Sequence, residues 1–366
     1  MYMQKRNHLA EILAATPKGE YYLYTDMAAA LAGVDSVRPA GITVDGAAVA
    51  LQQPDDVATQ RDATLDFLAD TVKSTPDTQL YLDFLANAAT PSIAQVALSA
   101  EHRYEICVNA PASDAALCVQ RLVLDVPSLV SAEAVVRASS LSALLLQLKV
   151  NVAAGASLRL VVLQDGEADK KIFSRTTLDL AADAHADVTF VNLHPALARN
   201  EVKCGIHDKG ADLRLNGLYV VGEGQQVDNE TLVEHYAGHS SSSQLFKGIA
   251  HGNGRMAFGG LILVKPDAQK TAAEQTNRHM LASREARAYA KPQLEIYADD
   301  VKCSHGATTG QIDPAQLFYM QQRGIDEATA RRLLAAAFVG EVVDMIPFSD
   351  IQDQLRARLT GESDAQ

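Results

Sequence analysis

Residues 103–312 form a long series of short β-type segments, and this feature constrains the fold more than any other. The segments are alternating aliphatic runs bounded by Gly, Asn and Asp, with no amphipathic helix pattern before about residue 313. A turn-forming stretch, a polar residue and an alternating strand recur at residues 153–163, 182–192, 208–218 and 252–262. The positions taken as equivalent in these runs are Leu158, Val188, Leu213 and Met256. Their spacings are about 30, 25 and 43 residues, and the last could hold two turns of about 20 residues each, which predicts a repeat architecture.

Three all-β architectures are compatible with this series: a sandwich, a barrel and a β-solenoid. Stacked coils tolerate an irregular repeat because each coil contacts only its neighbours. The hydrophobic share is 48%, yet the chain has no Trp and only 9 Phe and 11 Tyr, so its core must be mainly aliphatic. Aliphatic side chains suit the narrow interior of a β-helix better than Trp does. These two features favour a β-solenoid over a sandwich or a barrel for the mainly β region at residues 103–312.

The first 102 residues are predicted to form a mostly helical domain. Leu9, Ile12 and Leu13 have helical spacing, and a second helix fits residues 61–72. Between these helices, residues 37–39 and 41–46 are typical of short strands and turns. The 366 residues exceed the usual length of one domain, and three segments are expected.

Residues 313–366 are predicted to form a helical C-terminal domain. Asp313, followed by proline, is a typical N-cap, and Gly324 is placed to end that helix. Asp326 is expected to cap a longer helix whose apolar residues cover more than one face, so that helix should contact both its own domain and another body. Ser349 is expected to cap a last helix over residues 350–359, with Gly361 beyond it.

The charge balance and the cysteine pattern exclude several classes of protein. The chain has 32 Lys and Arg against 45 Asp and Glu, a net charge of −13, which argues against a nucleic-acid or anionic-membrane partner. It has no run of about 18 apolar residues that would span a membrane. Four scattered cysteines and the lack of a signal-peptide pattern favour a soluble, cytoplasmic protein without a disulfide framework.

Motifs for nucleotide chemistry and for hydrolysis are missing or weak. The chain has no phosphate-binding loop, so we expect it not to bind or hydrolyse ATP itself. Gly252-Asn-Gly254-Arg-Met-Ala257 resembles a dinucleotide fingerprint, but a strand pattern follows it, which favours a β-turn. The sequence has neither a serine-hydrolase elbow nor a cluster of carboxylates suited to glycoside chemistry.

Two histidine motifs have spacings found in metal sites. His235 and His239 are four residues apart, but Gly238 and the serines that follow disfavour a helix, so turn or surface positions are expected. Cys204 and His207 have no second pair of ligands nearby in the sequence, which favours a buried structural cysteine on a strand over a zinc site.

The stretch from residue 291 to residue 310 is the most informative part of the sequence. Apolar and polar residues alternate over 294–299, which predicts a half-buried strand. Cys303 and His305 follow two residues apart, so on an extended chain their side chains share a face, and both are candidate ligands for iron or another soft metal. An iron–sulfur cluster usually takes four ligands, so such a site would have to be shared across an interface. A buried cysteine beside an exposed histidine is the simpler interpretation.

Neighbouring stretches place the sequence in a known family by resemblance. They are Leu245-Phe-Lys-Gly-Ile249, Gln275-Thr-Asn-Arg278, Lys302-Cys-Ser-His-Gly306 and Gln316-Leu-Phe-Tyr-Met-Gln-Gln-Arg-Gly-Ile325. With them, residues 245–345 closely resemble the SufB/SufD family of iron–sulfur cluster scaffold proteins, in its SufD branch. The branch is indicated by the motif at 302–306, where SufB has a glutamate-flanked histidine. It is also indicated by the lack of a cysteine between Cys204 and Cys303.

The resemblance implies a right-handed parallel β-helix flanked by N-terminal and C-terminal helical domains. It also implies two partners: SufB, paired through the β-helices, and the ATPase SufC, held by the C-terminal helical part. In the family, the motif histidine acts where a nascent cluster forms at the SufB–SufD interface. That histidine corresponds to His305, while Cys303 matches the motif as either a ligand or a structural residue. The positions expected to dock the ATPase are Phe318, Arg323, Leu333, Leu334, Phe338 and Glu341.

Our leading hypothesis is a non-catalytic scaffold subunit that contributes His305 to a transient iron–sulfur cluster shared with SufB. Reduced flavin is a further candidate cofactor of the complex, although this chain has no motif for it, and the isolated chain is expected to be able to form a homodimer. Two alternatives remain open. One is a homodimeric metal-binding protein that uses Cys204, His207 and Cys303, and the other is a β-solenoid enzyme that acts on polysaccharides.

Overall fold

The computed structural model describes residues 30–31, 34, 36–49, 93–111, 116–141, 143–166 and 170–361. The helices predicted near residues 9–13 and over 61–72 lie outside the described residues. Residues 36–44 form two short strands, β1 (Ser36–Pro39) and β2 (Gly41–Val44), which confirms the extended segments expected there.

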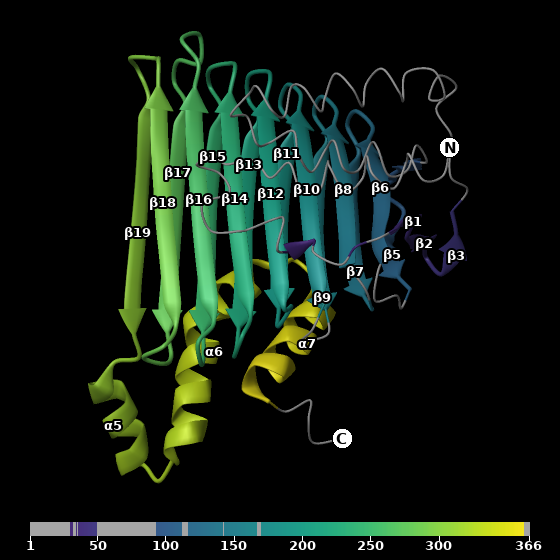
Figure 1. Ribbon diagram of the computed structural model, residues 1–366. Helices are drawn as coiled ribbons and strands as arrows, with labels where there is room; N and C mark the ends of the chain where they lie inside the picture. Colours follow the sequence, from purple (N-terminus) through teal and green to yellow (C-terminus); the bar gives the residue numbers. More distant parts are fainter. Residues whose placement is uncertain are drawn as a thin grey trace.

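The strands from residue 93 onward wind into a parallel β-helix of about seven turns with two long sheets, and β2 joins one of these sheets antiparallel to its first long strand (Figure 1). Beyond β1, sheet A contains β4 (Ile93–Ala97), β6 (Ala116–Val126), β8 (Ala143–Val152), β10 (Lys171–Leu180), β12 (Leu197–Ile206), β14 (Gln226–His235), β16 (Arg255–Val264) and β18 (Arg287–Ile296). Beyond β2, sheet B contains β3 (Ala47–Ala48), β5 (Arg103–Ala110), β7 (Ser131–Ser140), β9 (Ser157–Gly166), β11 (His185–Leu193), β13 (Asp212–Val221), β15 (Ser241–Ala250), β17 (Ala272–Leu281) and β19 (Lys302–Gln311). The predicted parallel β-helix is confirmed.

Each coil places one strand in each sheet, so strand neighbours in a sheet are one full coil apart in the chain. Leu158 is in register with Ala186, and Ala186 is in register with Leu213. Val188 is therefore two residues beyond the equivalent position. Met256 lies on β16, in the other sheet. The predicted long step with two short turns is wrong, because alternation marks a strand but not the sheet that it joins.

Aliphatic side chains fill much of the space between the two sheets. Strand β8, for example, contributes Leu144, Leu146, Leu148, Val150 and Val152 to one continuous buried cluster. Burying a leucine or valine side chain contributes roughly 1.5–3 kcal/mol to stability. The aliphatic core expected from the composition is confirmed.

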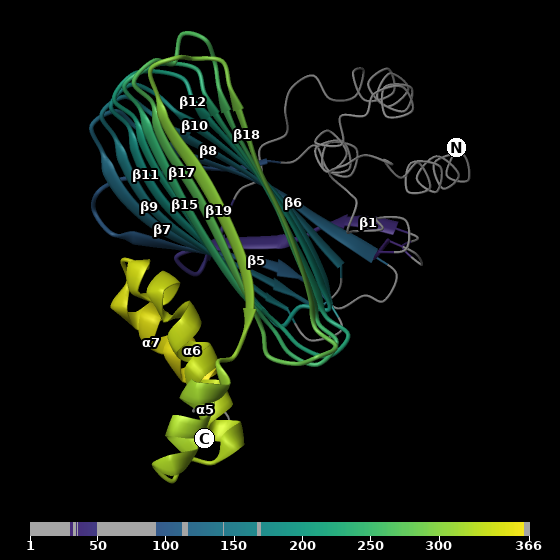
Figure 2. The ribbon, with the colours of Figure 1, turned by 90° about the vertical axis from the view of Figure 1, so that its left-hand side faces the viewer.

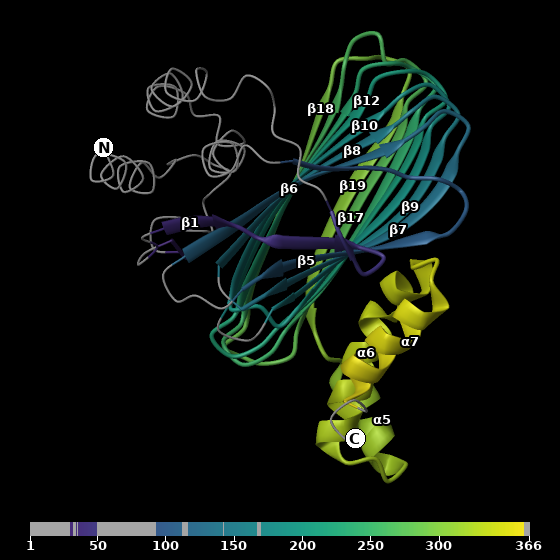
Figure 3. The ribbon, with the colours of Figure 1, turned by 90° about the vertical axis from the view of Figure 1, so that its right-hand side faces the viewer.

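Three helices follow the last strand; the second and third lie against the outer face of sheet B, whereas the first extends beyond the ends of the strands and contacts the second helix (Figures 2 and 3). They are α5 (Pro314–Gln322), α6 (Glu327–Met345) and α7 (Ser349–Thr360). Helices α6 and α7 bury Val339, Val342 and Leu355 in one apolar cluster with Val191 and Ile249 of the sheet. Within the described residues, no helix has the length and apolarity needed to cross a membrane.

The helix ends follow most of the sequence expectations. Asp313 and Asp326 accept backbone hydrogen bonds in the first turns of α5 and α6. Gly324 follows α5 with a φ of 84°, a conformation that suits glycine. Ser349, however, is the first residue of α7 and not its cap. The cap position is Phe348, which makes no side-chain capping bond and is instead buried in the apolar cluster.

Candidate functional site

The C-terminal end of the β-helix is an open pair of strands, β18 and β19 (Figure 2). In the described part of the chain, β19 pairs only with β17, and β18 pairs only with β16. The side chains of both strands are exposed or half-buried throughout. An unpaired strand presents N–H and C=O groups that can bond to the strand of another chain. The outer edges of β18 and β19 therefore have no strand partner among the described residues.

Cys303 lies on the inner face of β19, at the end of the core. It is half-buried and packs beside a small apolar cluster that includes Ile262, Ala273 and Ala298. Burial raises the pKa of the Cys303 thiol, so the protonated form is favoured near neutral pH. A bound soft metal would have to displace that proton.

His305 lies two residues further along the same face of β19. Cys303 is in register with Ala273 and His305 with Gln275, and both of these β17 residues are buried. The shared face expected from the sequence is therefore present. The imidazole is exposed, because no further coil covers it. The arrangement offers a partner chain one thiol and one imidazole.

A polar layer lies directly beneath this face. Gln275, in register with His305, donates to Gln244 over 3.5 Å, and Gln244 accepts a 2.9 Å hydrogen bond from Thr231. All three side chains are buried. The sequence indicated no role for them, because their common position appears only when the coils are stacked.

A second buried network continues the polar layer along β17. The Tyr219 hydroxyl lies 2.6 Å from His279 Nε2 and accepts a 3.0 Å hydrogen bond from Asn277. Tyr219 reaches His279 across an intervening coil because Gly248 occupies the register position between them, where a Cβ atom would lie 2.1 Å from the tyrosine ring. Burial lowers the pKa of His279 to about 4 and raises that of Tyr219, so both groups are neutral near pH 7.

The other metal-like motifs do not form sites. Cys204 is fully buried on β12, as expected of a structural cysteine, whereas His207 is exposed beyond the strand end and lies 2.8 Å from Asp179. His239 occupies a turn, as predicted. The surface position predicted for His235 is wrong, because His235 is completely buried at the end of β14.

A zinc site is not supported by these positions. Within the described residues, no group of three or more His, Cys, Asp or Glu side chains could hold a metal ion. In particular, Cys204 lies in the interior of the β-helix and Cys303 at its open end, on strands several coils apart. The described residues alone therefore do not complete a ligand set at Cys303 and His305.

The turn at Gly252 leads into β16, which begins at Arg255. Gly252 has a φ of 55°. The β-turn prediction is confirmed, and the glycine motif has no helix N-terminus that could face a pyrophosphate.

The residues expected to dock an ATPase fall into two groups. Phe318 and Leu333 are exposed, and the Arg323 guanidinium lies 5.0 Å from the ring centre of Tyr319 at the end of α5. Leu334 is half-buried. These side chains form the outward part of α5 and α6.

Phe338 and Glu341 instead face the β-helix. The buried Lys247 ammonium donates to the Phe338 carbonyl over 2.8 Å, lies 4.9 Å from its ring centre, and forms a 2.5 Å ion pair with Glu341. The hydrogen bond from Lys247 lowers the pKa of Glu341. These two residues anchor α6 to sheet B.

Comparison with known proteins identifies relatives of this chain. The family model described as SUF system FeS cluster assembly, SufBD core domain, matches residues 110–338. The chain is 38% identical over 210 residues to the iron-sulfur cluster assembly protein SufD of Escherichia coli (strain K12), which covers 57% of this chain and 50% of that protein. It is 36% identical over 137 residues to the Bacillus subtilis protein of the same name, covering 37% of this chain and 31% of that protein. A SufBD family protein of Mycobacterium leprae is 32% identical over 219 residues, covering 58% of this chain and 56% of the relative. The chain thus spans about half, or less, of the length of these curated relatives.

Proposed function

We propose, on the premise that this chain belongs to the SufBD family of iron–sulfur cluster assembly proteins, that it is a non-catalytic, SufD-like scaffold subunit of the SUF system. Its proposed partners are SufB and the ATPase SufC. The single observation that carries the proposal is the placement of Cys303 and His305 on one face of the last strand of the β-helix, whose outer edge has no partner strand among the described residues.

The open end at β18 and β19 is the proposed surface for SufB. A homologous β-helix can extend both sheets there through backbone hydrogen bonds, which need no particular side-chain sequence. The same geometry would let two copies of this chain pair when SufB is absent. Light scattering of the isolated chain, with and without SufB, distinguishes a homodimer from a heterodimer.

His305 is the proposed ligand for the nascent cluster, which is the cargo of the complex. An exposed imidazole at an interface can bind iron without a large desolvation cost, and the partner would supply the remaining ligands. Cys303 is a weaker candidate, because its thiol is half-buried and holds its proton more firmly.

The exposed part of α5 and α6 is the proposed docking element for SufC, through Phe318, Arg323, Leu333 and Leu334. Phe338 and Glu341 belong to this element indirectly, since they hold α6 on the sheet. We propose that ATP is bound by SufC and not by this chain. Reduced flavin is assigned to the assembled complex, with no described residue of this chain assigned to it, and the complex is placed in the cytoplasm.

The test is reconstitution of the complex with His305→Ala. Cluster formation, followed by visible absorbance and by iron and sulfide analysis, should be lost while SufB and SufC are still retained in a pull-down. His207→Ala is the matched control, because it removes another exposed histidine away from the open end. Normal cluster yield in the His305→Ala complex would refute the site.

A further inference from the structure

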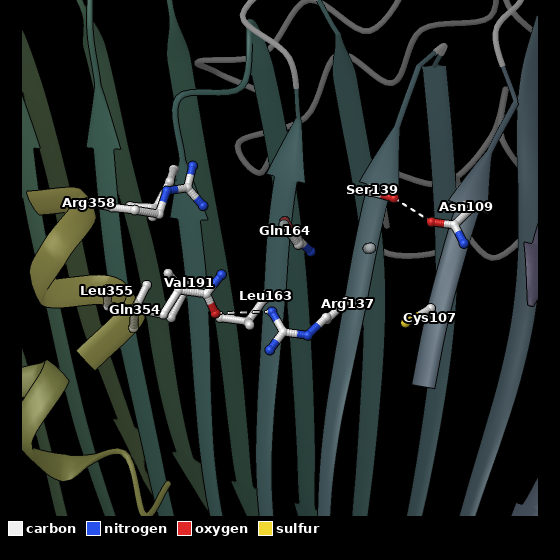
Figure 4. Close-up of a pocket in the computed structure, with 12 residues that line it drawn as sticks. Cys107, Asn109, Arg137, Ser139, Leu163, Gln164, Val191, Gln354, Leu355 and Arg358 are labelled. Carbon is white, nitrogen blue, oxygen red and sulfur yellow. Dashed lines mark hydrogen bonds between the residues drawn. The ribbon is translucent and has the colours of Figure 1, made fainter. Parts of the chain in front are cut away.

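A pocket lies at the seam between helix α7 and the outer face of sheet B (Figure 4). Strands β5, β7, β9 and β11 form one side, and α7 forms the other. The cavity volume is about 230 Å³. A cavity of about 150 Å³ already accepts a benzene ring, so this pocket has room for a small organic molecule.

The floor of the pocket is apolar and its flanks carry positive charge. Leu163, Val191 and Leu355 belong to the buried cluster that joins the helix to the sheet. Figure 4 shows Arg137 entering from β7 and Arg358 from α7, with Leu163 and Val191 between them. The two guanidinium groups thus flank an apolar surface from opposite sides.

Hydrogen-bond donors predominate at this pocket. Arg137 makes only long bonds, 3.4 Å to Glu105 and 3.3 Å to Gln354, and its Nη2 has no acceptor among the described residues. Asn109 uses its side-chain oxygen to accept from Ser139, which leaves its amide N–H groups for another acceptor.

No carboxylate lines the pocket, although the whole chain carries 45 Asp and Glu against 32 Lys and Arg. A donor-rich, carboxylate-free cavity in an acidic protein is complementary to an anion. We propose that this pocket binds a small organic anion. Its apolar body would lie on Leu163, Val191 and Leu355, and its carboxylate or phosphate would be held by Arg137, with Arg358 adding positive charge from the helix side. Because the pocket spans the seam, such a ligand would also fasten α7 to the β-helix.

Cys107 lies in the pocket wall, so its rate of alkylation reports directly whether the pocket is occupied. Two of the four free cysteines, Cys107 and Cys303, are half-buried, whereas Cys118 and Cys204 are buried. Alkylation by iodoacetamide, followed for each cysteine by mass spectrometry, should slow several-fold at Cys107 in the presence of benzoate. The rate at Cys303, outside the pocket, should not change.

Benzoate, benzamide and inorganic phosphate together test separately whether the ligand needs a negative charge and whether it needs an apolar body. Benzoate should protect Cys107 at lower concentration than either benzamide, which lacks the charge, or inorganic phosphate, which lacks the apolar body. No protection by benzoate, or equal protection by benzamide or by phosphate, would overturn the proposal.

Substitutions locate the site. Arg137→Gln and Arg358→Gln should each weaken benzoate binding about tenfold, and Ser139→Phe should block the pocket while keeping both arginines. Arg159→Gln is the control, since Arg159 is an exposed residue of β9 outside the pocket. Circular dichroism and the melting temperature of each variant report whether it is folded. Unchanged binding in folded Arg137→Gln and Arg358→Gln variants would likewise refute the assignment.

Discussion

The first and last coils of the β-helix share one backbone geometry but have different interiors. In β7, β8 and β9 the buried inward side chains are mostly Ala, Val and Leu. In β15 and β17 the corresponding positions include Ser242, Gln244, Gln275, Asn277 and His279. The hydrogen bonds between strands therefore determine the backbone geometry of each coil. The side chains that fill the interior can differ between coils, and they become more polar toward the end that carries His305.

The polar end carries more of one cost than the aliphatic end. On β15 and β17, the buried atoms without a hydrogen-bond partner among the described residues include Gln244 Nε2, Gln275 Oε1, Asn277 Oδ1 and His279 Nδ1, whereas β7, β8 and β9 have Gln164 Nε2. A buried polar group without a partner costs about 1–3 kcal/mol. We infer that the aliphatic coils supply more of the stability than the polar coils do.

The largest expected effect is the loss of a leucine from the aliphatic end. Leu160 on β9 is completely buried, and Leu160→Ala should lower the free energy of unfolding by about 3–5 kcal/mol, because it removes apolar contacts and leaves a cavity. Urea denaturation measures the change. Gln244→Ala, the matched truncation at the polar end, should cost less than half as much. Equal losses would show that the two interiors contribute alike.

Acid should destabilise the polar end. Burial lowers the pKa of both His235 and His279 to about 4, against an ordinary value near 6.5. Between these two pH values the unfolded chain binds more protons than the folded one, so the free energy of unfolding falls as the pH falls. The loss reaches roughly 2–3 kcal/mol per histidine near pH 4.

Denaturation curves recorded from pH 7 to pH 4 measure this dependence. His279→Gln removes one of the two titrating groups and should flatten the slope between pH 6.5 and pH 4. An unchanged slope in that variant would assign the acid sensitivity to other groups.

The alternation of apolar residues predicted the short strands, but choosing a β-helix over a sandwich or a barrel also needed the irregular repeat, the aliphatic composition and the family resemblance. Backbone ladders need only a period of two and turn residues, and both are local properties of the sequence. The common face of Cys303 and His305 followed from the same local rule. The same rule did not predict which sheet each strand joins, as the position of Met256 on β16 shows. Sheet membership depends on the length of every intervening turn.

Contacts between distant residues were beyond the reach of sequence patterns. Tyr219 meets His279 only because Gly248 lies between them in the stacked coils. Lys247 meets Glu341 only once α6 has packed on sheet B. A lysine on a strand and a glutamate on an amphipathic helix each suggest a solvent-exposed position when taken alone.

A smaller loss is expected when the buried network of the polar end is cut. Tyr219→Phe keeps the ring that fills the space above Gly248 but removes the hydroxyl shared by His279 and Asn277. The free energy of unfolding should fall by about 1–2 kcal/mol, because two buried polar groups lose their partner. Phe246→Leu is a control for ring packing in the same interior without a change in polar groups. A neutral Tyr219→Phe variant would mean that the network contributes nothing to stability.

The smallest change in stability is expected for Gln275→Leu, which distinguishes a structural from a functional reason for the polar interior. The substitution removes an unpartnered buried oxygen and a weak 3.5 Å bond, while Thr231 continues to donate to Gln244. The lost polar contact and the gained apolar contact should nearly cancel, so the free energy of unfolding should change by less than about 1 kcal/mol. A loss of more than about 2 kcal/mol would mean that Gln275 stabilises the fold. A near-zero change would mean that stability does not explain why this buried position holds a glutamine, because a leucine would fill the same space without a buried amide. Its place directly beneath His305 would then be the remaining explanation.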